Sequence, residues 1–103
     1  MKNEKSLKIY EEATKYIPGG VNSPVRAFKS VGLDPIFIER AHGSRIYDVD
    51  GNEYIDYICS WGPLMLGHSP KEIVEGIEEV VYRGTSYGVP TAIEVEMAKL
   101  VVE

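Results

Sequence analysis

The sequence has little cysteine and no long apolar run, and both absences limit what the protein can be. Cys59 is its one cysteine, which excludes an internal disulfide and any metal site built from several cysteines. A lone thiol is consistent with a reducing compartment, so we predict a cytoplasmic location. No apolar run approaches the roughly 18 residues of a membrane span, and the start of the chain is charged rather than signal-like. We expect a soluble protein with no membrane partner.

Basic residues are also scarce, and this bears on possible partners. The chain has 11 lysines and arginines against 16 acidic residues, which gives a net charge of -5. The basic residues are scattered, whereas a nucleic-acid-binding surface normally gathers them into a stripe. We therefore expect no nucleic-acid partner, although a local basic pocket for a small anion stays possible.

The common catalytic motifs are missing as well. There is no Walker loop, no dinucleotide-binding glycine motif, no zinc-protease motif and no nucleophile elbow. His42 and His68 lie far apart and lack companions at metal-ligand spacing, so we expect no metal site. Four acidic residues do not match an EF-hand and are interpreted as a solvated hairpin face: Asp48, Asp50, Glu53 and Asp56.

Periodicity and turn residues predict an α+β segment. An amphipathic helix is expected over residues 3–16, because apolar residues recur there at helical spacing, and Pro18-Gly19-Gly20 should end it. Three β-prone runs over 36–38, 45–49 and 53–58 predict a small antiparallel meander, with tight turns at His42-Gly43 and Asp50-Gly51-Asn52.

Two further helices are expected in the second half of the chain. Ser69-Pro70-Lys71-Glu72 and Thr91-Ala92-Ile93-Glu94 both have the spacing of a capping box, and each precedes an apolar pattern of helical period. The second pattern is still running at Glu103. Because such a small chain has several apolar faces to cover, we interpret residues 1–103 as one segment of a larger protein.

The stretch Val21-Asn22-Ser23-Pro24-Val25-Arg26 fits neither a helix nor a strand. Pro24 fixes its own φ and favours an extended Ser23, so the loop is expected to be stiff. A guanidinium presented by such a loop suits bidentate binding of a carboxylate, but an ordinary surface arginine beside a capping serine is the more common case. Spacing alone leaves both interpretations open.

Two other glycine-rich segments are ambiguous in the same way. Trp61 stands between a β-prone run and a Gly-Pro pair, where it could form the wall of a pocket or belong to the core. The hydroxyl-containing loop from Arg83 to Pro90 could be only a connector between two helices.

In order along the chain, several motifs resemble one enzyme family. "PGGVNSPVRAF", "DVDGNEYIDY", "SWGPLMLGHSP" and "GTSYGVPTAIEVEMAKLV" are similar to the amino-terminal part of the glutamate-1-semialdehyde 2,1-aminomutases. These are pyridoxal-phosphate enzymes of the aspartate-aminotransferase fold (fold type I), within the class III aminotransferases. The hairpin motif is shared widely in class III, whereas "GGVNSPVRAF" and "SWGP" are more specific.

The resemblance implies an activity and roles for three residues. Glutamate-1-semialdehyde, which is (S)-4-amino-5-oxopentanoate, would be converted to 5-aminolevulinate for tetrapyrrole (porphyrin) biosynthesis by a homodimer using pyridoxal or pyridoxamine phosphate. Ser23 and Arg26 match the substrate-carboxylate site of the family, and Trp61 matches its pocket wall. The loop from Gly84 to Gly88 corresponds to a dimer interface.

The family's cofactor lysine and phosphate loop have no counterpart in this chain. No lysine here stands in a matching motif, so residues 1–103 alone are expected to bind no cofactor and to be inactive. Two alternatives stay open: another class III ω-aminotransferase, or an interaction module without catalysis. The coding sequence beyond Glu103 would distinguish the module from the enzyme.

Overall fold

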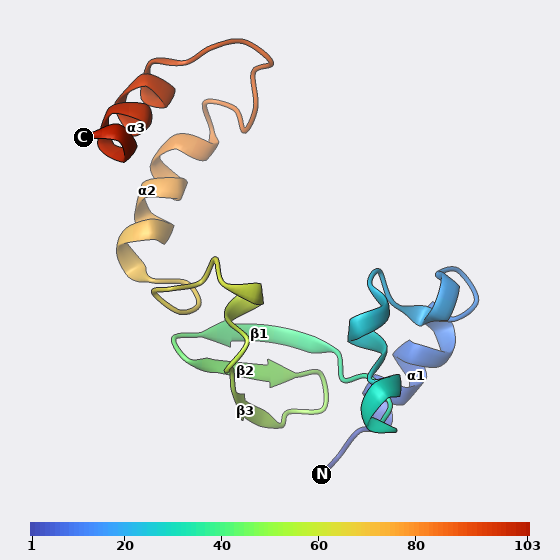
Figure 1. Ribbon diagram of the computed structural model, residues 1–103. Coiled ribbons are helices and arrows are strands. Elements are labelled where there is room, and N and C mark those ends of the chain that lie inside the picture. Colours follow the sequence, from blue (N-terminus) through green and yellow to red (C-terminus); the bar gives the residue numbers. More distant parts are fainter. The chain divides into compact units, whose positions relative to one another are not determined.

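The computed structural model describes all residues from Met1 to Glu103. They form two compact units, Met1–Pro70 and Lys71–Glu103, and each is described by itself. Figure 1 labels their helices and strands. None of the helices is both long enough and apolar enough to span a membrane.

The first unit begins with helix α1, Glu4–Ala13. It ends before the predicted Tyr16, because residues 14–17 form turns, and Pro18–Gly20 then makes a short 3-10 turn. The residue of α1 that is buried is Ser6, 1% exposed, rather than one of the apolar residues. Its hydroxyl oxygen accepts a hydrogen bond from the Phe37 amide, 3.3 Å away, so α1 is tied to the chain that enters the sheet.

The predicted meander is confirmed as a three-stranded antiparallel sheet in the order β1-β2-β3. Its strands are β1 (Ile38–His42), β2 (Arg45–Asp48) and β3 (Glu53–Ile55). The first strand starts later than predicted, since Phe37 bonds to Val49 only through one carbonyl and a bulge follows between Ile38 and Arg40. The guanidinium of Arg40 lies 3.6 Å from the centre of the Tyr47 ring on the neighbouring strand, a cation–π contact across the sheet.

Of the four acidic residues predicted to form a solvated hairpin face, only Glu53 is exposed, and for the other three the prediction was wrong. Asp48 is 1% exposed. Its Oδ1 accepts the amides of Asp50 and Asn52 at 3.0 and 2.8 Å, and its Oδ2 accepts the Asn52 side chain and the Tyr54 hydroxyl at 2.7 Å each. Burial opposes ionisation of Asp48, but these bonds outweigh it and lower the pKa of the carboxyl.

The same network affects two neighbours of Asp48. Burial and the bond to Asp48 raise the pKa of Tyr54 to about 12, so its hydroxyl stays protonated and donates. Asp50 accepts the amides of Lys5 and Ser6 at 2.8 and 2.9 Å. Amides of the first turn of a helix have no acceptor within the helix. The Asp50 carboxylate supplies one and so caps α1 from 45 residues away in sequence.

The second unit consists of α2 (Lys71–Val81) and α3 (Ala92–Val102) joined by a loop. Both predicted helices are confirmed. The Thr91 capping box is present, with the Thr91 amide donating to Glu94 at 3.2 Å. At the start of α2, however, Ser69 has a φ of 51°, which is not the extended backbone of an N-cap residue.

Apolar side chains in this unit are left uncovered. Every residue from Lys71 to Glu103 except Thr91 is exposed. On α2 the exposed apolar residues share one helical face: Ile73, Val74, Ile77, Val80 and Val81.

Candidate substrate-binding site

The segment with Ser23 and Arg26 is a short 3-10 turn, Pro24–Ala27. Ser23 precedes it with an extended backbone (φ -147°, ψ 132°), as the following proline requires. The Arg26 amide donates to the Ser23 carbonyl at 2.9 Å, and Phe28 ends the turn at a φ of 56°. The expected stiff loop is therefore present, and it keeps Ser23 and Arg26 within one turn.

The burial of this turn decides where Arg26 can act. Ala27 is buried, whereas Arg26 beside it is exposed and takes part in no ion pair. Arg26 borders a pocket of about 330 Å³ whose other walls include Ile17, Gly20 and Phe37. A free guanidinium at the edge of a largely apolar pocket can bind an anion in charge-assisted fashion.

Gly20 allows the chain before Ser23 to lie close to α1. It is buried with a φ of 73°, and a Cβ there would lie 2.5 Å from the ring of Tyr10. No other residue fits that contact without displacing the ring. The glycine pair thus serves as more than a helix terminator, because it sets the path of the chain toward Ser23.

Trp61 lies in a second turn, Cys59–Trp61, and its side chain is 71% exposed. The core alternative is therefore wrong in this unit, and a pocket-wall role stays a prediction. The turn is unusual: Cys59, Ser60 and Trp61 have φ values of 50°, 53° and 66°, and Gly62 follows at 112°. Three successive non-glycine residues in the left-handed region are strained, so other contacts must hold them there.

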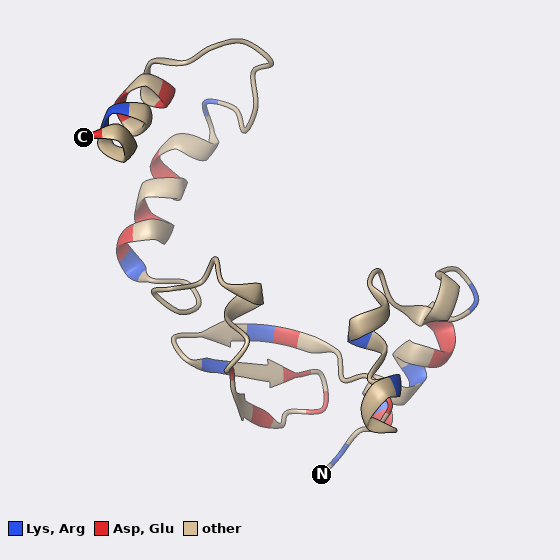
Figure 2. Ribbon diagram, in the orientation of Figure 1, with Lys and Arg blue, Asp and Glu red and all other residues tan.

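The structure does not bring all three predicted site residues together. Ser23 and Arg26 share one turn, whereas Trp61 lies elsewhere: Figure 1 shows Pro24–Ala27 beside α1 and Cys59–Trp61 near the other end of β1. The two segments also differ in charge. The first contains Arg26, whereas the chain from Tyr57 to Gly67 carries no charged residue and is tan throughout in Figure 2.

Sequence reasoning missed the contact between Asp56 and His68. Asp56 Oδ2 lies 2.7 Å from Nε2 of His68, and Asp56 Oδ1 accepts the amides of Ile58 and Cys59 at 2.8 and 3.1 Å. The bond to His68, followed by the two amide bonds, lowers the pKa of Asp56. An Asp twelve residues before a His has no sequence signature that could have revealed this pair.

No lysine of the chain has the surroundings of one that forms a Schiff base with pyridoxal phosphate. All seven lysines are exposed, whereas a lysine that forms a Schiff base is activated by a desolvated or cationic surrounding. No group of three or more His, Cys, Asp or Glu side chains is placed to hold a metal ion either. The residues present do not fit the cofactor by themselves.

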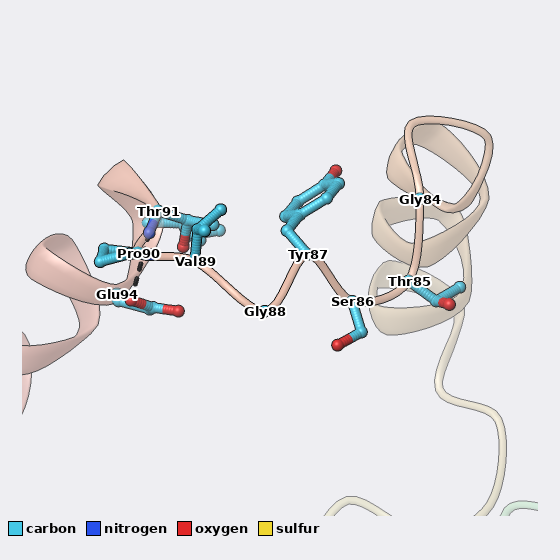
Figure 3. A pocket seen from close by; sticks show the side chains of 10 residues that line it. Gly84, Thr85, Ser86, Tyr87, Gly88, Val89, Pro90, Thr91 and Glu94 are labelled. Carbon is cyan, nitrogen blue, oxygen red and sulfur yellow. Dashed lines mark hydrogen bonds between the residues drawn. The ribbon is translucent and has the colours of Figure 1, made fainter.

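The loop between α2 and α3 forms a hydroxyl-lined hollow of about 690 Å³ (Figure 3). Thr85, Ser86 and Tyr87 border it on one side, and Figure 3 shows the bond from Thr91 to Glu94 on the other. The Tyr87 hydroxyl donates to the Arg83 carbonyl at 2.9 Å, which folds the loop back on the end of α2. The predicted connector therefore has one side-chain bond to the helix that precedes it.

Comparison with known proteins defines the class. The chain matches the family Aminotransferase class-III over residues 28–101, and it belongs to that family. A solved transaminase with PLP bound superimposes with a TM-score of 0.84 at 39% identity, covering 96% of this chain and 23% of that one. The predicted fold is therefore confirmed: an α+β segment of the kind found in PLP-dependent class III enzymes.

Sequence relatives narrow the similarity further. The chain is 74% identical over its full length to a glutamate-1-semialdehyde 2,1-aminomutase of Clostridium novyi, and 62% identical to one of Persephonella marina. It spans 24% of the length of each. A crystal structure of a glutamate-1-semialdehyde-aminomutase from Pseudomonas aeruginosa shares the fold, with a TM-score of 0.78 at 23% identity.

Proposed function

We propose that the chain is the amino-terminal part of a glutamate-1-semialdehyde 2,1-aminomutase. The complete enzyme converts (S)-4-amino-5-oxopentanoate to 5-aminolevulinate for tetrapyrrole (porphyrin) biosynthesis. The observation that carries this proposal is the 74% identity over all 103 residues to a relative of that name. The cofactor is pyridoxal or pyridoxamine phosphate, and it is bound by residues outside this chain.

Ser23 and Arg26 bind the substrate carboxylate in this proposal, and Trp61 forms a pocket wall. The stiff turn supports the first role, because it presents an exposed and unpaired guanidinium next to an extended serine. A substrate that is re-oriented during the reaction gains from a fixed anchor at its unreactive end. The exposure of Trp61 supports the second role, since its ring is free to contact a ligand.

The remaining parts of the proposal concern assembly and location. The complete protein is a cytoplasmic homodimer without nucleic-acid or membrane partners, and the loop from Gly84 to Gly88 lies at its interface. The exposed tyrosine and valine of this loop, Tyr87 and Val89, support an interface role.

The activity test uses the full-length protein with pyridoxamine phosphate and glutamate-1-semialdehyde. We expect 5-aminolevulinate to form, measured by condensation to a coloured pyrrole. A complete protein that binds the cofactor and yields no 5-aminolevulinate refutes the proposal.

An ω-aminotransferase is the second candidate, because solved enzymes of that kind share the fold. A β-phenylalanine aminotransferase from Variovorax paradoxus and an omega-transaminase from Sphaerobacter thermophilus superimpose with TM-scores of 0.85 and 0.80. The fold therefore does not separate the two activities. Competition between glutamate-1-semialdehyde and simple ω-amines does, and we expect the semialdehyde to be strongly preferred.

Arg26→Ala in the full-length enzyme tests the anchor. Loss of a charge-assisted bond should raise KM roughly 10–100-fold. Arg26→Lys should be intermediate, because lysine keeps the charge but not the bidentate geometry. Arg45→Ala is the matched control, since Arg45 is an exposed arginine already paired with Glu53 at 3.1 Å. If Arg26→Ala leaves KM at the control value, Arg26 is an ordinary surface charge.

A further inference from the structure

The chain from Tyr57 to Gly67, which we call the Trp61 loop, is closed where it leaves and re-enters the rest of the unit. Asp56 stands before it and His68 after it, and their side chains meet at 2.7 Å. The Asp56 carboxylate has a lowered pKa and accepts only, so Nε2 of His68 carries the proton of this bond. Both side chains are largely shielded from solvent, at 9% exposed for Asp56 and 20% for His68.

Backbone bonds fix this closure to the turn between β1 and β2. The Asp56 amide donates to the Ser44 carbonyl at 2.9 Å. Gly43 and His68 exchange two amide–carbonyl bonds, at 2.8 and 2.9 Å. The loop is thus anchored at both ends, and the Asp56–His68 bond joins the two anchors.

The carboxylate of Asp56 also reaches into the loop. Its Oδ1 accepts the amides of Ile58, which precedes the left-handed run, and of Cys59, the first residue of that run. Within the run, the Trp61 amide bonds to the Ile58 carbonyl at 3.0 Å and the Gly62 amide to that of Cys59 at 3.1 Å. One side chain therefore holds both the entrance of the strained turn and, through His68, the exit of the loop.

Apart from Asp56, backbone bonds within the loop fix its shape, such as those from the Leu64 amide to the Cys59 carbonyl at 3.3 Å and from the Gly67 amide to the Leu64 carbonyl at 3.0 Å. The loop contains no charged residue, Leu64 is half-buried, and the other large apolar side chains are exposed: Tyr57, Ile58, Trp61, Met65 and Leu66. Strained backbone persists only where surrounding contacts over-determine it. Here these contacts are backbone bonds within the loop and the two bonds to the Asp56 carboxylate, which is the one side chain that accepts amides of the turn.

We propose that Asp56 and His68 are positioning residues, which set the left-handed turn of the Trp61 loop and thereby the place of Trp61 in the substrate pocket. The inference deepens the proposed function and rests on it, because Trp61 must contact substrate for its position to matter. Asp56 and His68 themselves touch no reacting atom in this scheme.

A double-mutant cycle in the full-length enzyme tests this coupling. Asp56→Ala should lower kcat/KM about 10-fold or more when Trp61 is present, but less than about 3-fold in a Trp61→Ala background. His68→Ala should show the same dependence on Trp61 with a smaller loss, because Asp56 then keeps its two amide bonds. A purely structural role would give the same loss in both backgrounds.

Two variants sharpen the cycle. Asp56→Asn keeps an oxygen that can accept the two backbone amides. Its NH₂ group can donate to Nε2 of His68 when the histidine proton lies on Nδ1. This variant should therefore keep most of the activity that Asp56→Ala loses. Glu53→Gln is the matched control: a carboxylate three residues away, in an exposed pair with Arg45, whose loss should change kcat/KM less than about 2-fold.

The outcomes separate this inference from the proposed function. If wild type makes no 5-aminolevulinate, the proposed function has failed. If wild type is active but the losses in Asp56→Ala and His68→Ala persist unchanged without Trp61, or Trp61→Ala itself has no effect, only the positioning role is overturned. Should Asp56→Ala not fold, the His68→Ala cycle decides whether the coupling to Trp61 exists.

Discussion

Hydrogen bonds of different range stabilise the two units of the chain. Between Met1 and Pro70, aspartates bond to groups far away in sequence, as when Asp50 accepts the amide of Lys5 across 45 residues. Between Lys71 and Glu103, the bonds and ion pairs join residues three or four positions apart, such as Thr91 with Glu94 and Lys71 with Glu75. The first unit is therefore a tertiary structure held in part by carboxylates that bond across the sequence, and the second is a pair of locally specified helices.

The difference also shows what each unit needs from its surroundings. Helices of this length gain most of their stability from packing an apolar face against a partner, and the faces of α2 and α3 are exposed in this chain. The first unit has little apolar core either, with only Ala27 and Pro35 as buried apolar side chains, but its carboxylates compensate by pairing backbone amides.

The strongest test of this comparison is Asp48→Ala. The change removes four hydrogen bonds, those from the Tyr54 hydroxyl, the Asn52 side chain and two backbone amides, which should cost about 3 kcal/mol in the stability of the first unit. Hydrogen exchange of the full-length protein, followed by mass spectrometry, should show lost protection within residues 1–70 and none within 71–103. Asp34→Ala, at an exposed aspartate, is the control. Equal loss of protection in both units would contradict the division.

Gly67→Ala should give the next largest effect. Gly67 has a φ of 79°, and a Cβ there would lie 2.7 Å from the Gly43 carbonyl oxygen, so alanine adds a backbone clash to the left-handed strain. We expect a loss of about 2 kcal/mol or more, against roughly 1 kcal/mol for Gly51→Ala, which has a positive φ but open space. Local protection around Gly43 and His68 is the measurement. If Gly67→Ala lost no more stability than Gly51→Ala, the predicted clash with the Gly43 carbonyl would be contradicted.

Glu94→Ala should have the smallest effect and should stay within the second unit. Its carboxylate accepts the Thr91 amide at the start of α3, so its loss should cost about 0.5–1 kcal/mol. Exchange of the first-turn amides of α3 should speed up while residues 1–70 are unchanged. Glu96→Ala, on the same helix, is the control. Altered protection in the first unit would show that α3 is not specified locally.

Much of the fold could be predicted from short stretches of sequence. Thr91 with Glu94 predicted the start of α3, Gly51 the turn between β2 and β3, and Pro24 the extended backbone of Ser23. Each of these depends on the conformational preferences of a residue and its immediate neighbours, which the sequence states directly.

Tertiary structure alone decided where the carboxylates of the hairpin point. As a sequence, the acidic residues from Asp48 to Asp56 looked like a solvated face, yet Asp48 is buried, Asp50 caps α1 and Asp56 binds His68. The left-handed run at Cys59, Ser60 and Trp61 was equally unforeseen, because no local preference favours it. Contacts of this kind form only when the chain folds back on itself, and the energy of the distant partner then overrides what the local sequence prefers.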